Sequence, residues 1–234
     1  MDKRKIMIGV LGVIGIVLVV GLLYSLLTKD SDDGSLVDSS SEVVLEQESS
    51  QEQVDQEEIT EEASFPVAAN CGLTKNVTEG PYYVSGTMEL VDGNLNYDNY
   101  SGTEISLVGR VLAGASDDAE PIEGAKIEFW QTDDDGNYHP NSNGTYEQYG
   151  TDIISLRGYI LTDAMGRYDL STIYPGYYEG RARHIHVRIS ADGYQTTTTQ
   201  LIFQPEPGDG QTYSTDSIAQ SLGSCYLMDM TDEE

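Results

Sequence analysis

Residues 184–190 read HIHVRIS, and branched apolar side chains alternate there with polar ones. This alternation predicts a β-strand with one buried face, because successive side chains on a strand point to opposite sides. His184 and His186 therefore project from the same side, where two imidazoles can chelate a metal ion. The alternative places both histidines on the solvated face of an edge strand. We favour the metal, because the chain has only three histidines and this pair follows PGYY and two arginines.

Short strand-like runs dominate the rest of the chain's second half. Their alternation, branched residues and aromatics predict strands, and the Gly, Asn and Asp clusters between them predict turns. DDDGNY and DAMGRY have the composition of tight turns that lead into a strand. The runs are ISLVGRVLAG, AKIEFWQT, RGYILTD, GRYDLST, RHIHVRIS and TTTTQLIF. Many short strands without a long amphipathic helix predict an all-β fold, a sandwich of antiparallel sheets.

Length and charge limit the other possibilities. A chain of 234 residues suits one ordinary domain with appendages better than two domains. The formal net charge of -28 argues against a nucleic-acid partner, because phosphate binding requires a basic surface. Much of this charge lies in one segment, so it says little about the folded part.

The chain opens with MDKRK and continues with an uncharged apolar run at residues 6–27. A run of roughly 20 apolar residues is long enough for a helix to cross a bilayer. Three bases precede the run and aspartates follow it, which predicts a cytoplasmic N-terminus and an extracytoplasmic remainder. The alternative is a cleaved signal peptide and a secreted protein. We favour an uncleaved anchor at residues 1–27, because the run is long and no A-x-A-like site follows Leu27.

Residues 28–64 are rich in Ser, Gln, Asp and Glu and contain one base, Lys29. Dense like charge with few aromatics leaves too little apolar surface to offset chain entropy, which predicts a disordered linker. An acidic ligand for a partner is an alternative role, but a spacer between the membrane and a domain at residues 65–234 is favoured.

Cys71 opens this predicted domain and Cys225 nearly closes it. The predicted location outside the cytoplasm favours a disulfide over two buried thiols. Such a bridge would close a loop of roughly 150 residues, for which chain entropy gives at most about 5 kcal/mol.

Several ordered motifs resemble the intradiol ring-cleavage dioxygenases, the non-haem ferric enzymes that include catechol 1,2-dioxygenase and protocatechuate 3,4-dioxygenase. The motifs are CGLTKNVTEGPYYV, LVGRVL, PIEGAKIEFWQTDDDGNY, LRGYILTDAMGRYDLSTIYPGYYEGRARHIHV and TTQLIF. They cover nearly all of the chain from Cys71 to about Phe203, and the resemblance is strongest to short exported members. The chain lacks the helical N-terminal dimerisation segment of the catechol enzymes, so their mode of dimerisation is not implied.

The resemblance implies an Fe(III) ion held by two tyrosines and two histidines. The first tyrosine ends the family's WxxxxxGxY pattern and is Tyr138. The second follows a proline by three residues and is Tyr178, and the histidines are His184 and His186. This donor set also makes chemical sense, because hard ferric iron is matched by anionic oxygen donors and neutral imidazoles. His139 is expected to point to the opposite face from Tyr138.

The family pattern also implies residues around the iron. Arg181, three residues before His184, and Gln200 of the TTQ segment would stabilise negative charge during the reaction. The TEGPYY segment would face the substrate through Gly80, Pro81 and Tyr82. The link between Tyr178 and His184 is shorter than in the catechol enzymes, so no particular catechol is implied.

The resemblance therefore implies an oxidoreductase that cleaves aromatic diols with O2 to cis,cis-muconate-type products, with Tyr178 leaving the iron as the diol binds. A surface pairing of Arg181 with Glu179 is the alternative to its catalytic role. A second hypothesis is a membrane-tethered β-sandwich that binds without catalysis, since the fold alone does not imply an activity. The arrangement of the four candidate ligands around one point discriminates between the two hypotheses.

Overall fold

The computed structural model describes residues 4–7, 11–12, 71–116, 118–150, 152–178, 180–228 and 231–232. The linker predicted at residues 28–64 lies outside these residues, as do residues 1–3, 8–10 and 13–27 of the predicted basic tip and anchor. Within the described part of the chain, no helix is long and apolar enough to cross a bilayer. The described strands form two larger sheets and one small sheet.

The first sheet is built on β4 (Glu104–Leu112) and β8 (Arg167–Ile173), which pair antiparallel. β4 forms from the predicted run ISLVGRVLAG, because its alternating apolar residues bury one face of the strand. Two short strands, β1 (Arg4–Met7) and β2 (Leu11–Gly12), run parallel to β4. β1 also pairs with β12 (Thr231–Asp232).

The short strands β1 and β2 differ from the helix predicted for residues 6–27, because they include residues 6–7 and 11–12. The physical reason lies in β4, whose edge away from β8 presents backbone N–H and C=O groups that an extended segment can pair with. For the remainder of the apolar run, the anchor stays a prediction.

The second sheet carries the histidine pair. Its strands follow the order β11-β10-β9-β5-β7. They are β5 (Lys126–Trp130), β7 (Arg157–Leu161), β9 (His184–Ser190), β10 (Thr197–Phe203) and β11 (Leu227–Met228). Every one of the six runs predicted from the sequence therefore contains a strand of one of the two larger sheets.

The central pairs β5–β7, β5–β9 and β9–β10 are antiparallel, as predicted. The pair β10–β11 is parallel, which the prediction of antiparallel sheets did not include. β11 reaches the sheet through a long connection that contains α1 (Ser217–Leu222), so no hairpin turn forces it to run antiparallel.

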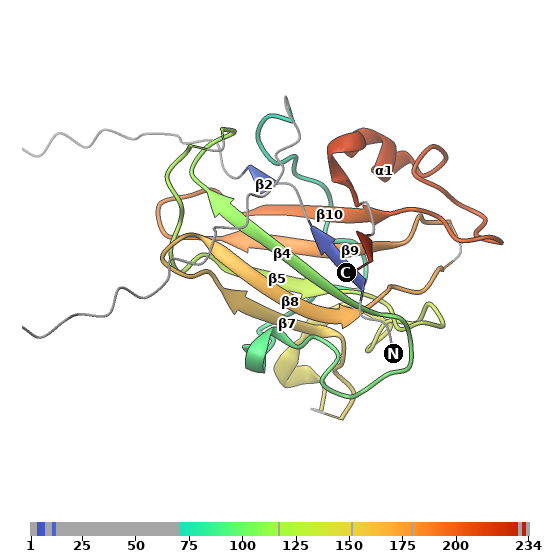
Figure 1. Cartoon of the computed structure of the whole chain (residues 1–234). Helices are drawn as coiled ribbons and strands as arrows, with labels where there is room; N and C mark the ends of the chain where they lie inside the picture. Colours follow the sequence, from blue (N-terminus) through green and yellow to red (C-terminus); the bar gives the residue numbers. More distant parts are fainter. Residues whose placement is uncertain are drawn as a thin grey trace, which may run out of the picture. The chain divides into compact units, whose positions relative to one another are not determined.

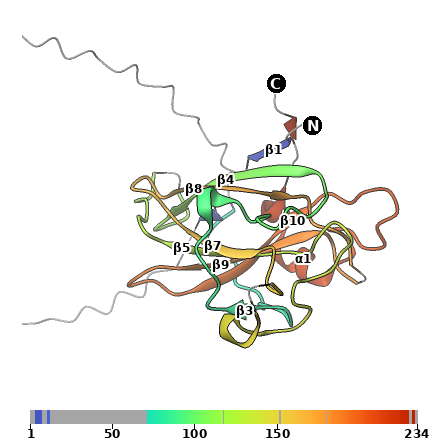
Figure 2. The ribbon, with the colours of Figure 1, turned by 90° about the horizontal axis from the view of Figure 1, so that it is seen from below.

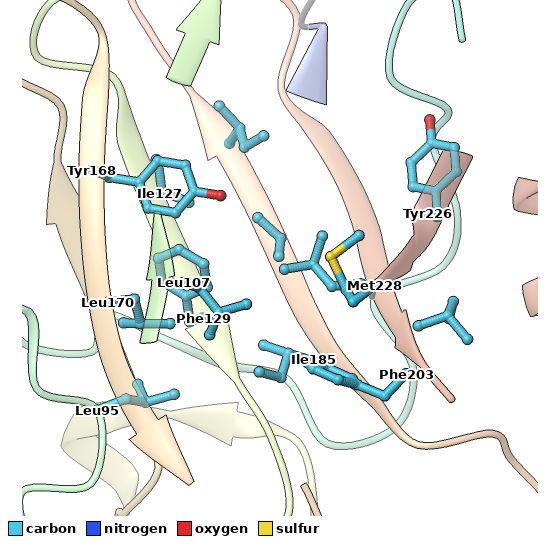
Figure 3. Packing of buried hydrophobic residues seen from close by; sticks show 14 of the residues in the cluster. Leu95, Leu107, Ile127, Phe129, Tyr168, Leu170, Ile185, Phe203, Tyr226 and Met228 are labelled. Carbon is cyan, nitrogen blue, oxygen red and sulfur yellow. The ribbon is translucent and has the colours of Figure 1, made fainter. Parts of the chain in front are cut away.

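The two sheets pack face to face and enclose the hydrophobic core (Figure 2). Leu107 and Tyr168 of the first sheet lie in one buried cluster with Phe129 and Ile185 of the second (Figure 3). The rings of Phe129 and Tyr168 approach across the layers, with centroids 5.7 Å apart. Each large apolar side chain buried in this way contributes about 1.5–3 kcal/mol to folding. The predicted all-β fold, with two sheets packed around one core, is confirmed.

The remaining elements are short (Figure 1). β3 (Val84–Ser85) and β6 (Gly144–Thr145) form the small parallel sheet. The carboxylate of Asp216 caps the first turn of α1 by accepting hydrogen bonds from the backbone N–H groups of Ile218 and Ala219. The 3₁₀ helices span Val91–Gly93, Tyr146–Gln148 and Ser224–Tyr226.

A disulfide joins Cys71 to Cys225 across 154 residues of sequence, with the two Cα atoms 5.7 Å apart. The predicted bridge is therefore present. Lys75 lies beside it and donates from Nζ to the carbonyl of Leu222 at 2.7 Å, while its backbone N–H donates to Tyr226 Oη. The covalent bond and these hydrogen bonds tie the start of the described domain to its C-terminal segment.

Candidate metal centre

The histidine pair lies on the face of the second sheet that points away from the sandwich core. The alternation predicted for β9 sends Ile185 and Val187 into the hydrophobic cluster, and His184 and His186 to the opposite side. Both imidazoles are nevertheless buried, each with 2% of its residue surface exposed. Loops cover this outer face of the sheet, so the predicted solvated edge-strand alternative is wrong.

A single row of residues crosses four of the five strands of this sheet, from β7 to β10. Arg157 of β7 lies opposite Trp130 of β5, and Trp130 lies opposite His186 of β9. His186 in turn lies opposite Gln200 of β10. Directly opposed residues of antiparallel strands share one face. The indole ring of Trp130 accordingly stacks on the imidazole of His186, with centroids 4.6 Å apart and an angle of 6° between the rings.

The loop after β5 delivers Tyr138 to this face. It begins with a tight turn in which the N–H of Gly136 donates to the carbonyl of Asp133, as the DDDGNY pattern predicts. Gly136 has a positive φ of 85°, and a Cβ atom there would lie 2.1 Å from the carbonyl oxygen of Tyr177. Only glycine fits this position, because it tolerates both the conformation and the close approach. The turn therefore brings the two tyrosine-bearing segments together.

Tyr178 approaches from the segment between β8 and β9. The N–H of Gly176 donates to the carbonyl of Asp133 at 2.8 Å, which fastens this segment to the Tyr138 turn. The rings of Tyr138 and Tyr178 meet edge to face, with centroids 5.6 Å apart. Tyr138 is almost fully buried, whereas Tyr178 is partly exposed. Tyr178 is thus the more accessible of the two phenols.

The four predicted ligands converge on one point. Nε2 of His184 lies 3.1 Å from Nε2 of His186 and 3.4 Å from Oη of Tyr138. The ring of Tyr178 completes the group, with its centroid 5.7 Å from that of His184. Two nitrogens bound at about 2.1 Å to one ion at right angles would be about 3 Å apart. The separations of these three donor atoms therefore fit a single metal ion, with the ring of Tyr178 beside them.

Hydrogen bonding fixes the tautomer of His184. Its Nδ1 lies 2.6 Å from the carbonyl oxygen of Ala182, which can only accept, so Nδ1 carries the proton. The lone pair of Nε2 then faces the other candidate ligands. Burial, together with the charge of Arg181, lowers the pKa of His184 to about 3. Burial and the neighbouring His184 also hold the pKa of His186 well below its usual value. Both imidazoles are neutral at pH 7, which is the form that binds metals.

The phenols require a cation to ionise. Burial raises the pKa of Tyr138 well above 10, and the adjacent Tyr178 raises it further. Burial also raises the pKa of Tyr178, although Arg181 acts in the opposite direction. A bound trication lowers the pKa of a coordinated protic group strongly. Two such phenols beside two neutral imidazoles therefore form a donor set suited to a hard, highly charged ion such as Fe(III).

Arg181 lies beside the ligands and not on the open surface. Its Nη2 donates to Oε1 of Gln200 at 2.7 Å, and its Nε donates to Oδ2 of Asp216 at 2.8 Å. Nη1 lies 3.5 Å from Oη of Tyr178. Gln200 also contacts His186, with its Nε2 3.4 Å from Nδ1. Both predicted charge-stabilising residues are thus brought together with the ligands, and Glu179, the alternative partner of Arg181, lies outside the described residues.

The predicted substrate-side segment also reaches the site. The ring of Tyr82 stacks on that of Tyr138 with centroids 4.4 Å apart, and it meets Tyr178 edge-on at 6.2 Å. A Cβ atom on Gly80 would lie 3.5 Å from Cε1 of His186, so the backbone passes close to the ligands. Pro81 is exposed.

His139 is directed away from the ligand set, as expected from its place next to Tyr138. Its Nε2 lies 2.8 Å from Oδ2 of Asp133, and its ring packs against Tyr100. In the described part of the chain, no group of three His, Cys, Asp or Glu side chains is placed to bind a metal. The site therefore depends on tyrosine oxygens, which distinguishes it from a structural zinc site.

The sequence did not identify three residues that the structure places at the site. Trp130 stacks on His186, Asp216 holds Arg181, and Arg157 lies under Tyr138. One signal for Arg157 is its position as the charged residue of the otherwise uncharged strand RGYIL. Asp216 offers no such signal, because an aspartate before a short helix is an ordinary cap.

Known proteins resemble this chain along most of the described domain. The family model described as Dioxygenase matches residues 78–233. Catechol 1,2-dioxygenase of Acinetobacter baylyi is 29% identical over 181 residues, which are 67% of this chain and 53% of that protein. Chlorocatechol 1,2-dioxygenase of Pseudomonas sp. strain P51 is 28% identical over 144 residues, 54% of each chain. The chain thus spans about half the length of the curated relatives it matches.

Two solved structures match a larger share of their own chains. The dioxygenase domain of a dioxygenase and carbohydrate-binding fusion from Streptomyces sp. SirexAA-E is 30% identical, with a TM-score of 0.53, covering 69% of this chain and 90% of that one. An intradiol ring-cleavage dioxygenase from Tetranychus urticae is 26% identical, with a TM-score of 0.57, covering 68% and 86%. The family match spans more than half of the sequence, and the chain belongs to the intradiol ring-cleavage dioxygenase family.

Proposed function

We propose that the protein is a non-haem Fe(III) dioxygenase that cleaves catechol-type diols between their two hydroxylated carbons. Both atoms of O2 enter the product, a cis,cis-muconate-type dicarboxylic acid. The observation that carries the proposal is the convergence of Tyr138, Tyr178, His184 and His186 on one point. A binding module without catalysis would not require two phenols and two imidazoles in this arrangement.

These four residues would hold the iron. Ferric iron supplies a Lewis acid that binds the diol oxygens and withdraws electron density from the ring. Tyr138 is the permanent oxygen donor in this proposal, because it is buried and its ring packs against both Tyr82 and Arg157. The neutral imidazoles of His184 and His186 complete the set.

Tyr178 is placed to exchange with the substrate. It is the more exposed phenol, and Arg181 lies 3.5 Å from its oxygen. As a diol binds, the displaced phenolate oxygen of Tyr178 accepts a hydroxyl proton and acts as a general base. The guanidinium of Arg181 stabilises Tyr178 as an anion until that transfer.

Arg181 and Gln200 supply preorganised charge to the substrate. The carboxylate of Asp216 and the amide of Gln200 fix the guanidinium beside the ligands, so it needs no rearrangement during the reaction. Fixed positive charge of this kind stabilises negative charge that develops on the bound diol. Trp130 covers His186 from the side of the sheet and excludes water there.

The test is to load the purified protein with Fe(III) and record its visible spectrum and its oxygen uptake with a panel of catechols. Tyrosinate bound to ferric iron absorbs in the visible, so we expect a wine-red to purple protein. Anaerobic catechol should shift the band as Tyr178 is displaced. Uptake of one O2 for each diol, with a dicarboxylic acid as product, would establish the reaction.

Ligand variants refine this test. His184→Ala and His186→Ala should each lose most of the iron, because each removes a direct donor. His139→Ala is the matched control, since the third histidine binds Asp133 and should leave the iron content unchanged. A colourless protein that binds zinc as readily as iron and leaves every catechol intact would contradict the proposed function.

A further inference from the structure

Arg157 is the most deeply buried charged residue of the site region, with 1% of its surface exposed. Among the described residues, no carboxylate forms an ion pair with it, whereas Arg181, Arg183 and Arg188 each have an acidic partner. Burying a cation without an anion is costly, and such residues usually have a partner. The position of Arg157 therefore calls for an explanation.

The guanidinium of Arg157 binds backbone carbonyls from two segments. Nε donates to the carbonyl of His139 at 2.7 Å, and Nη2 donates to that of Pro140 at 2.8 Å. Nη1 donates to the carbonyl of Tyr82. The first two carbonyls directly follow Tyr138, and the third belongs to the segment whose ring covers Tyr138. Arg157 thus joins the chain around one predicted ligand to the predicted substrate side.

The same guanidinium faces the ring of Tyr138, with Cζ 5.6 Å from the centroid. A phenolate at Tyr138 would be the anion that this buried cation otherwise lacks. The attraction is strong here because the surroundings have a low dielectric constant.

The backbone around Arg157 is held in an unfavourable conformation that aims the side chain inward. Leu156 has a positive φ of 51° although it is a bulky, fully buried residue. Strain of this kind persists where surrounding structure enforces it, and it is common at functional sites. Tyr97 holds the backbone on both sides of Leu156, since its Oη donates to the carbonyls of Ile154 and Arg157 at 3.1 and 3.3 Å.

We propose that Arg157 is a positioning residue of the metal centre, which fastens the Tyr138 segment to the Tyr82 segment and stabilises Tyr138 as a tyrosinate. The inference rests on the proposed function, because it assumes that Tyr138 binds iron. Arg157 does not contact the reacting atoms. Its charge stabilises the phenolate of Tyr138, and its hydrogen bond to the carbonyl of Tyr82 holds that segment in place.

The test separates charge from geometry with two variants of the full-length protein. Arg157→Met removes the charge and the hydrogen bonds, and Arg157→Lys keeps the charge but loses the planar fork that reaches three carbonyls. Arg188 provides matched controls, Arg188→Met and Arg188→Lys. Its Cζ lies 5.2 Å over the ring of Tyr83, which is not a predicted ligand.

The first readout is the tyrosinate band of the iron-loaded protein. A nearby cation lowers the energy of the phenolate electrons, so Arg157→Met should shift the band to longer wavelength, whereas Arg157→Lys should leave it close to the wild-type position. The second readout is amide hydrogen exchange at residues 80–83 in the metal-free protein. Both Arg157 variants should exchange there roughly tenfold faster, because a charged hydrogen bond is worth at least that factor. The Arg188 controls should not shift the band.

The outcomes distinguish this inference from the proposed function. A wild-type protein without a tyrosinate band would refute the proposed function, and this inference with it. A coloured wild type with an unshifted band in Arg157→Met would overturn the inference and leave the proposed function standing. Circular dichroism shows whether the variants fold. If neither Arg157 variant folds, Arg157 is a structural residue of the core and the inference is wrong.

Discussion

Two buried histidines that face each other at 3.1 Å would destabilise the fold if both were charged. Burial keeps the imidazoles neutral, and the carbonyl of Ala182 holds the proton of His184 on Nδ1. The neutral form with a free Nε2 is also the form that binds a metal. A single arrangement therefore serves both the stability of the domain and the iron binding proposed for this site.

Arg181 offers the clearest test at the scale of one residue. Arg181→Ala should lower turnover by a factor of about 10²–10³, because it removes preorganised charge beside the substrate. The iron content and the colour should persist, because Arg181 is not among the four ligands. Oxygen uptake with catechol measures the first effect, and the visible spectrum measures the second.

Arg110→Ala is the control for this variant, since Arg110 lies on the other sheet and donates to the carbonyl of Met165. It should change neither quantity. Arg181→Ala also leaves the buried carboxylate of Asp216 without its cationic partner, so the melting temperature of this variant should be compared with that of the wild type as well. Loss of iron together with activity would make Arg181 a structural residue of the centre.

At the scale of elements, the site depends on how β5, β7, β9 and β10 are registered. The row from Arg157 through Trp130 and His186 to Gln200 exists only because these four strands pair without a slip. A shift by one residue would move His186 to the core face and Val187 to the site. The hydrophobic core on the other face therefore fixes the position of the two histidines proposed as metal ligands.

The short link between Tyr178 and His184 is held by the segment that follows β10. Arg181 binds Asp216 of that segment, and Arg183 binds Asp209 through two hydrogen bonds of 2.7 and 2.9 Å. Bidentate pairs of this kind are among the stronger ionic contacts. The connection that precedes α1 thus supports this link.

Asp209 makes this support dependent on pH. Burial raises the pKa of Asp209, but the hydrogen bonds from Arg183 and from the N–H of Glu206 outweigh it and lower the pKa below the usual value. A lowered pKa stabilises the fold above the unfolded value of about 3.9, and the contribution is lost as pH falls through the folded pKa. Asp209→Asn should therefore cost on the order of 2 kcal/mol at pH 7 and progressively less below about pH 4.

Urea unfolding at pH 7 and pH 3.5 measures this difference. Asp192→Asn, at an exposed aspartate outside these contacts, should leave the free energy of unfolding nearly unchanged at both pH values. A deficit for Asp209→Asn that stays constant over this range would mean that the carboxylate charge is not the origin of the stabilisation.

At the scale of the whole molecule, the disulfide joins the two ends of the domain. Replacing both cysteines by serine should destabilise the domain by about 2–5 kcal/mol, which lowers the melting temperature by roughly 10 °C for a domain of this size. Iron binding should persist, because neither cysteine lies among the ligands. Thiol labelling of the unfolded, unreduced wild type should detect no free cysteine, and two reactive thiols would contradict the bridge.

Residues 6–7 and 11–12 pair with β4 in the structure, and we propose that in a membrane the apolar run 6–27 leaves this pairing and forms an anchor, with a cytoplasmic N-terminus and an extracytoplasmic domain. The full-length chain should then remain with membranes after a high-salt wash, and a chain that begins at Phe65 should be soluble. A mature protein that begins after Leu27 in the medium would indicate a cleaved signal instead. A full-length chain in the soluble fraction would favour strand pairing of this region with β4 over an anchor.

Local patterns in the sequence were sufficient for six strands of the two larger sheets, for the Asp133–Gly136 turn and for placing His184 and His186 on one face of a strand. These features depend on the period of two along a strand and on the residues that tight turns require, and both act over a few neighbouring residues. Resemblance to a known family added Tyr138 and Tyr178, which no local pattern links to the histidines. The disulfide followed from the chain's two cysteines and the predicted location outside the cytoplasm.

The tertiary structure alone decided which residues support the ligands. Arg157, Trp130 and Asp216 lie far from the histidines in sequence, and they reach the site through strand register and through the return of the chain after β10. Register is set by the joint packing of two sheets, which no segment encodes by itself. The strand pattern and the family motifs in the sequence thus indicated which groups could bind a metal, and long-range packing determined what surrounds them.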